Sequence, residues 1–458
     1  MRALAGWHAE IAVDERRDDD DPLTGFTELA ARTTIDNILK SGLDPVSMTP
    51  VLLLSTGEHR TTTETAFADP LATLRADLAA WCTHLYLARV LREATSARAA
   101  AMRDEHDADE YGRPASMRAM LRSLARPKQA GGVPEPRAAI AICDLAPLML
   151  DGILDEEGRR RELGDPLGPI AQCCVRTEPA MVEAARTFLR DTEDEAREHV
   201  EHGARAAGRK TKNLTWVDLF AIRRAADVSE GWPATLSGRW LAELSRGTEL
   251  LAGLTVDVQV DAARLTPRAS HAGLFLAPPT GAWTFAHALY ALGGALHIFG
   301  RDTKQPFASH TRAHDPRPYI LGEAFGALAC AEAFHTRARG VGKPKAQLAA
   351  RRLSGTRLLE RRQLAMRVLL APELGKNRRA FVESFAGMAD DVIGGETPRE
   401  LAALLGAPGP LGPAEDVARF SAIEQGEALA RSLTEQFDSD WWRNPKAALA
   451  IRDRCARG

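Results

Sequence analysis

The residues best placed to do chemistry lie in one short stretch, TFAHALYALGGALH, which runs from Thr284 to His297. A hydrolytic zinc helix needs two histidines at positions i and i+4, which then point the same way and hold one metal ion. It also needs a glutamate directly after the first histidine, which takes a proton from the metal-bound water. His287 and His297 are separated by about 15 Å of helical rise, so they cannot share one metal ion.

The segments around this stretch predict how it is positioned. LTVDVQVDA, which begins at Leu254, alternates apolar and polar residues and is typical of a half-buried strand. GLFLAP predicts a second short strand that ends at PPTG, and a helix is expected from Thr284 to Phe299. A strongly apolar helix, YILGEAFGALACAEAF, follows the next polar loop and carries Glu323.

In this arrangement the stretch resembles the active-site helix of the oligopeptidase-type gluzincin metallopeptidases, such as thimet oligopeptidase and oligoendopeptidase F. The bacterial branch reads His-Glu-x-Gly-His, then a small residue, a variable one and another His. Tyr290 stands in place of the first zinc histidine, Ala291 in place of the catalytic glutamate, and Gly294 in place of the second histidine. His297 matches the last histidine of the motif, and LGEAFGALACAEAF resembles the second helix, which puts Glu323 at the third zinc ligand.

Two later segments resemble the same family, ERRQLA around Arg361 and Arg362 and FDSDWWRNPKA with Trp441 and Trp442. The resemblance covers about 210–458. It implies a mainly α fold, a large helical zincin-like body of the oligopeptidase type with a cleft and a small β-sheet before the active-site helix. We expect an acidic polar tail over 1–24, a helical N-terminal region over 25–210 and a degenerate metallopeptidase-like catalytic domain over 211–458.

The departures from the family pattern remove its chemistry. Two of three ligands and the general base at position 291 are missing, and no tyrosine follows Tyr319 to stabilise an oxyanion as the family's tyrosines do. One carboxylate is far from a four-coordinate zinc site, and loss of a general base costs roughly 10²–10⁴-fold in rate. Tyr290, Gly294 and Glu323 would form a vestigial metal site, and we expect neither zinc nor any other cofactor.

Other polar residues are candidates for the same pocket, namely His287, His297, His310 and His314. A rebuilt metal site of His297, Glu323 and either loop histidine, His310 or His314, is geometrically conceivable. The simpler interpretation is two loop histidines and one buried, hydrogen-bonded histidine. We predict instead that the Tyr290 hydroxyl bonds to Glu323 and fills the site, because a buried carboxylate needs a partner or a proton. The glycine pair before Ala295 either permits close helix packing or is a remnant of the zinc pocket.

Composition excludes several other classes. Net charge is −3, hydrophobic residues make up 45% and charged residues 26%, which is globular usage without the basic excess of a nucleic-acid-binding protein. No segment predicts a membrane span or signal peptide, so we expect a cytoplasmic protein. The six cysteines form no Cys-x-x-Cys pair and are interpreted as free thiols. His199 and His202 are expected on a solvated, charged helix face.

The sequence therefore predicts a catalytically inactive peptidase homologue, a pseudopeptidase, that binds a peptide or protein partner in the old substrate cleft. The alternative is an enzyme with repurposed, non-zinc chemistry on a small peptide or metabolite, which would use Tyr290, Glu323, His287 and His297. A residual metallopeptidase ranks third. The sequence does not specify the ligand or the oligomeric state.

Overall fold

The computed structural model describes the chain in several ranges. They are 135–167, 179–232, 282–300, 316–374, 376–408 and 412–457, the strand segments 105–107, 114–117, 255–258, 264–267 and 272–276, and positions 120, 121, 124, 244, 248 and 250. The predicted tail over 1–24, the first part of the helical region predicted over 25–210 (residues 25–104), and the loop residues His310 and His314 lie outside the described residues.

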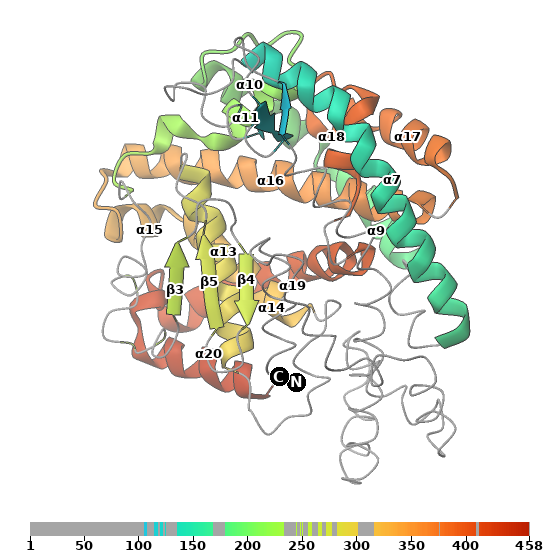
Figure 1. Cartoon of the computed structure of the whole chain (residues 1–458). Coiled ribbons are helices and arrows are strands. Elements are labelled where there is room, and N and C mark those ends of the chain that lie inside the picture. Colours follow the sequence, from blue (N-terminus) through green and yellow to red (C-terminus); the bar gives the residue numbers. More distant parts are fainter. Residues whose placement is uncertain are drawn as a thin grey trace, which may run out of the picture.

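The described chain is mainly helical, as predicted, and builds one large helical body (Figure 1). Its α-helices are α7 (Glu135–Leu167), α9 (Pro179–Asp191), α10 (Glu193–Ala206), α11 (Trp216–Arg224), α13 (Ala282–Phe299), α14 (Arg317–Gly326), α15 (Glu332–Arg337), α16 (Lys343–Leu374), α17 (Arg378–Ala386), α18 (Ala389–Ile393), α19 (Pro413–Phe437) and α20 (Pro445–Arg457). Among these described helices, none is both long and apolar enough to cross a membrane.

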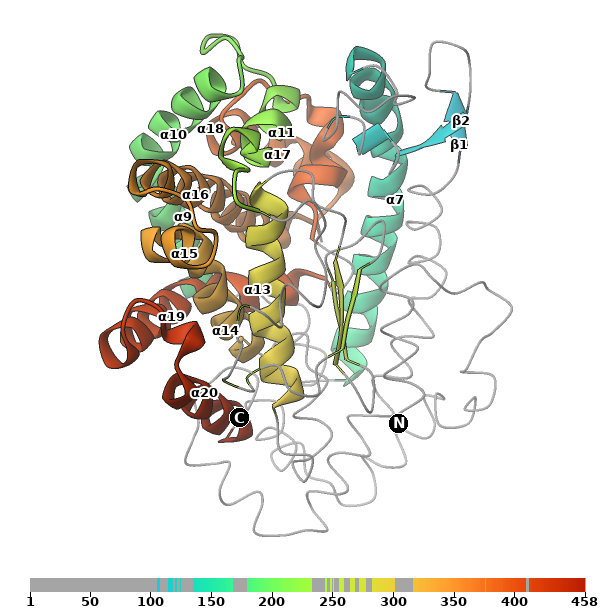
Figure 2. The ribbon, with the colours of Figure 1, turned by 90° about the vertical axis from the view of Figure 1, so that its left-hand side faces the viewer.

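Short strands accompany the helices. β3 (Thr255–Val258), β4 (Arg264–Pro267) and β5 (Ala272–Leu276) form a sheet of order β3-β5-β4, in which β5 runs parallel to β3 and antiparallel to β4. Figure 2 shows this sheet on one side of α13 and helices α14, α16 and α19 on the other. β1 (Glu105–Asp107) and β2 (Pro114–Ser116) pair antiparallel. They lie within 103–136, where the charged residues, prolines and glycines predict loops around a short helix.

Helix α16 links the two main apolar clusters of the described chain. Leu359 and Met366 pack into the cluster formed with α7, α10, α11 and α17, whereas Ala349 and Leu353 pack into the cluster around α13, Trp441 and α20. Burial of these side chains stabilises the helix in a fixed position between them. Three of its arginines, Arg357, Arg361 and Arg367, pair with carboxylates of α14 and α19.

Two expectations for helices and surfaces are wrong. The sequence predicts one helix over about 215–250, but α11 ends at Arg224, because Ala225 adopts the left-handed conformation with φ of 48° and caps α11. His199, expected on a solvated face, is buried and only 8% exposed. Its ring lies where the Cβ of any larger residue at Gly355 would be, 1.8 Å from the ideal Cβ position.

Candidate functional site

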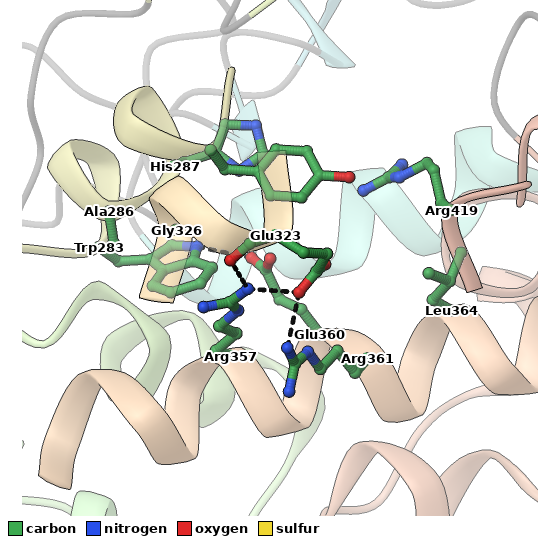
Figure 3. A pocket seen from close by; sticks show the side chains of 11 residues that line it. Trp283, Ala286, His287, Glu323, Gly326, Arg357, Glu360, Arg361, Leu364 and Arg419 are labelled. Atoms are coloured by element: carbon green, nitrogen blue, oxygen red, sulfur yellow. Dashed lines mark hydrogen bonds and ion pairs between the residues drawn. The ribbon is translucent and has the colours of Figure 1, made fainter. Parts of the chain in front are cut away.

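Helices α13, α14, α16 and α19 surround a pocket that encloses about 480 Å³ of space not filled by atoms, part of it open to solvent (Figure 3). Tyr290 from α13 and Glu323 from α14, two of the three predicted vestigial positions, both line it. The lining residues are Trp283, Ala286, His287, Tyr290, Glu323, Gly326, Arg357, Glu360, Arg361, Leu364 and Arg419.

Glycines allow the helices to come close enough to form this pocket. A Cβ at Gly293 would lie 2.4 Å from the backbone oxygen of Leu321, so the α13–α14 contact requires glycine at that position. A Cβ at Gly426 would lie 2.2 Å from the Cβ of Glu323, so α19 approaches α14 in the same way. Close packing of α13 on α14 is therefore the role of Gly293, the first glycine of the predicted pair.

Glu323 is a buried carboxylate held by two arginines of α16 (Figure 3). Its Oε2 accepts hydrogen bonds from Arg357 and, at 2.6 Å, from Arg361. Arg357 also donates to the backbone oxygen of Glu323, and Arg361 also pairs with Glu427 on α19. Burial alone would raise the pKa of Glu323, but the two guanidinium charges and their hydrogen bonds hold it below its ordinary value. Glu323 is therefore ionised at neutral pH and paired with both arginines through Oε2.

Tyr290 has a different partner from the one predicted. Its hydroxyl accepts a hydrogen bond from Arg419, and its ring packs over Gly322, where a Cβ would lie 3.3 Å from two ring carbons. Burial raises the pKa of Tyr290 to about 12, although the positive charge of Arg419 acts in the opposite direction. The predicted Tyr290–Glu323 hydrogen bond is wrong, because within the described chain arginines bind both groups.

Of the other predicted site residues on α13, one lines the pocket and three are buried in the core. His287 lines the pocket, and its ring stacks on that of Tyr290 with centroids 6.1 Å apart. Burial lowers the pKa of His287, which keeps the imidazole neutral at neutral pH. Ala291, Gly294 and His297 are buried on α13 and do not line the pocket.

The arginines are the site residues that sequence reasoning missed. Arg357 and Arg361 come from α16 and Arg419 from α19, far from Tyr290 in sequence. The doublet of Arg361 and Arg362 was the one visible signal, but only its first member reaches the pocket. Arg362 turns away and donates to the backbone oxygen of Leu189 at 2.5 Å.

Metal-ligating side chains do not cluster in this part of the molecule. Across the described ranges, no three His, Cys, Asp or Glu side chains are arranged so that they could hold a metal ion. Glu360, the second carboxylate of the pocket, accepts a hydrogen bond from the Trp283 indole at 2.5 Å.

Comparison with solved structures relates this fold to peptidases. A structure of PZ peptidase A with an inhibitor matches with a TM-score of 0.60 and 10% sequence identity, over 100% of this chain and 84% of that chain. A carboxypeptidase from Pyrococcus furiosus matches with a TM-score of 0.44 and 11% identity, over 99% of this chain and 88% of that chain. No family model and no curated protein matches the sequence. At 10% identity the first match concerns the fold alone, so the chain has the large helical fold of that peptidase.

Proposed function

We propose that this protein is a catalytically inactive peptidase homologue that binds a peptide or protein partner in its old substrate cleft. One observation carries the proposal. Glu323, which the resemblance assigns to the position of the third zinc ligand, is neutralised by Arg357 and Arg361. The facing position is Tyr290, which is bound to Arg419.

This arrangement opposes zinc binding on electrostatic grounds. A dication at Glu323 would have to displace two guanidinium groups that already satisfy the carboxylate, and it would remain close to their positive charges. Tyr290 offers a phenol with a pKa of about 12, which stays protonated at neutral pH and is a poor zinc ligand. His287 is the one histidine among the described residues that line the pocket, and its ring stacks on Tyr290. A single histidine cannot replace the two missing zinc ligands.

Two of the candidates for repurposed chemistry, Tyr290 and His287, are poorly suited to acid–base catalysis near neutral pH. An efficient general acid or base has a pKa close to the working pH. The pKa of Tyr290 is raised and that of His287 is lowered, so both move away from this range. This argues against repurposed chemistry and in favour of binding.

Two features support a binding role. The chain shares its fold with PZ peptidase A, whose solved structure carries an inhibitor. Among the described strands of the sheet beside α13, β3 and β4 lie at the two edges, and an extended peptide can pair with an exposed strand edge through main-chain hydrogen bonds.

Metal analysis and peptide incubation together test the proposal. The full chain, purified with zinc present, is expected to retain less than about a tenth of an equivalent by mass spectrometry. A random pool of short fluorescent peptides should bind and be recovered with unchanged masses. Close to one equivalent of zinc, with cleavage that a chelator stops, would overturn the proposal. If peptide masses change and a chelator does not prevent the change, the alternative of an enzyme with repurposed chemistry would be favoured instead.

A further inference from the structure

We infer that the pocket takes a carboxylate group of the bound peptide, held by Arg419 and the Tyr290 hydroxyl. The inference rests on the proposed function and specifies the chemistry of its ligand. The carboxylate could belong to a free peptide C-terminus or to an acidic side chain, and both present the same group.

The charges around the pocket leave one arginine in excess. Three arginines and two glutamates line it. Arg357 and Arg361 are paired with Glu323, and Arg361 is also paired with Glu427. Arg419 forms no ion pair with any carboxylate in the described part of the chain, although it lines the cavity and has a guanidinium that is always charged.

The acidic residues nearest to Arg419 in sequence have other hydrogen-bonding partners. Glu415 accepts a hydrogen bond from the Tyr319 hydroxyl at 3.3 Å, and Asp416 pairs with Arg367 at 2.8 Å. Burial lowers the pKa of Arg419, but Tyr290, Glu415 and Asp416 together outweigh this and raise it. The negative charges of Glu415 and Asp416 hold the cation in place without a direct ion pair, and the N–H groups that do not bind Tyr290 are available to a ligand.

Tyr290 supplies a second donor at the same point. Its oxygen accepts from Arg419, and because its pKa is about 12 the hydroxyl keeps its proton and can donate it in a hydrogen bond. Figure 3 shows Arg419 approaching from the opposite side of the pocket to Arg357. A carboxylate beside Arg419 therefore meets two donors, while the negative charge of Glu323 is already neutralised on the far side.

Peptide pools that differ only in one carboxylate test this inference on the full-length protein. Random short peptides with a free C-terminus are compared with the same pool as C-terminal amides. A second pair of amidated pools carries Glu or Gln at one fixed position. In at least one pair, the pool that carries the carboxylate should bind with a Kd about tenfold or more lower than its amide or Gln counterpart. Hydrogen bonds to charged groups contribute enough free energy for a difference of this size. The pair that shows the preference identifies the source of the carboxylate.

Variants assign the preference to the pocket. Arg419→Gln should abolish it, Arg419→Lys should keep part of it, and Tyr290→Phe should weaken it. Arg431→Gln, an exposed arginine on the same helix, should leave it unchanged. Tyr290→Phe retains the ring that packs over Gly322, so it also serves if Arg419→Gln does not fold.

Two outcomes overturn the inference. One is equal binding of acid and amide in both pairs, and the other is a preference for the acid that persists in Arg419→Gln. Either leaves the proposed function standing if peptides still bind uncut. Absence of binding by every pool would instead contradict the proposed function itself.

Discussion

Arg361 on α16 donates a hydrogen bond to Glu323 on α14 at 2.6 Å, and both side chains are largely buried. Arg357, one helical turn earlier, donates to the same carboxylate oxygen. Two guanidinium groups thus supply positive charge to one carboxylate, which keeps Glu323 ionised although it is buried.

Replacing Glu323 with Gln should destabilise the fold strongly. The variant leaves Arg357 and Arg361 without their shared negative partner inside the protein, and breaking a buried ion pair on one side costs about 3–5 kcal/mol. Urea unfolding monitored by circular dichroism measures the loss. Glu193→Gln is the matched control, because the Glu193–Arg197 pair is exposed (54% and 61%) and should contribute little. Equal effects of the two substitutions would show that the Glu323 network is not a stabilising element.

The same carboxylate gives a defined pH dependence. The folded-state pKa of Glu323 is lowered from 4.5, so the unfolded state binds the proton more readily. Its contribution is therefore complete above the unfolded pKa and is lost as pH falls through the folded value. The difference in unfolding free energy between wild type and Glu323→Gln should be constant near neutral pH and shrink below pH 4.5. A difference that does not change with acid would contradict an ionised Glu323.

His199 should add a second acid-sensitive step at higher pH. Burial, reinforced by the charge of Arg352, lowers its pKa from 6.5 to about 3, so the folded state keeps the imidazole neutral. Since the unfolded state takes up the proton first, wild type loses stability as pH falls from 6.5 towards 3. His199→Gln removes this titration, so its deficit relative to wild type should narrow over that range. A deficit that is the same at pH 7 and pH 4 would refute the assignment.

Sequence patterns predicted the helices better than their ends. Strongly apolar runs located α13 and α14, because most side chains of both helices are buried in the core. Ala225 ends α11 in a left-handed conformation that glycine usually adopts, so the sequence carried no signal for that boundary. His199 looked solvated because its neighbours are charged, and its burial depends on the space left by Gly355 in a distant helix.

The site was also predictable only in part, because some of its contacts join residues that are far apart in the sequence. The resemblance placed Tyr290 and Glu323 in one pocket, and the structure brings them there. The arginines that bind them come from α16 and α19, and pairing between distant charges leaves no periodic pattern in a single sequence. A buried carboxylate needs a partner, but the sequence alone did not favour arginine over the nearer tyrosine.

Two helical glycines should respond in opposite ways to the same substitution. Gly355→Ala places a methyl group where the His199 ring lies, so it should destabilise by about 1–3 kcal/mol. Gly158→Ala on α7 meets nothing within 4 Å and should stabilise by up to about 1 kcal/mol, because alanine favours helix. Thermal and urea unfolding of both variants provide the comparison. A neutral Gly355→Ala would mean that the His199 ring can move aside at no cost.

Arg339 should be irreplaceable by lysine. Its guanidinium donates to the backbone oxygens of Val228 and Glu230 and lies 4.6 Å from the centroid of the Trp232 ring. The guanidinium also lies 2.7 Å from Nδ1 of His335. Nε2 of that ring lies 2.8 Å from the Ala329 carbonyl oxygen, which can only accept a hydrogen bond. Nε2 therefore carries the proton, and Nδ1 accepts from Arg339.

A lysine ammonium has three donors on one atom and cannot reach three separated acceptors while stacking on the ring. Arg339→Lys should therefore leave buried acceptors unpaired and cost about 1–3 kcal/mol in unfolding free energy. Arg337→Lys, two residues earlier, is the control. Arg337 and its partner Asp440 are 44% and 35% exposed, so this substitution should change the unfolding free energy little. If Arg339→Lys matched the control, the planar geometry of the guanidinium would not be what joins α15 to the segment after α11.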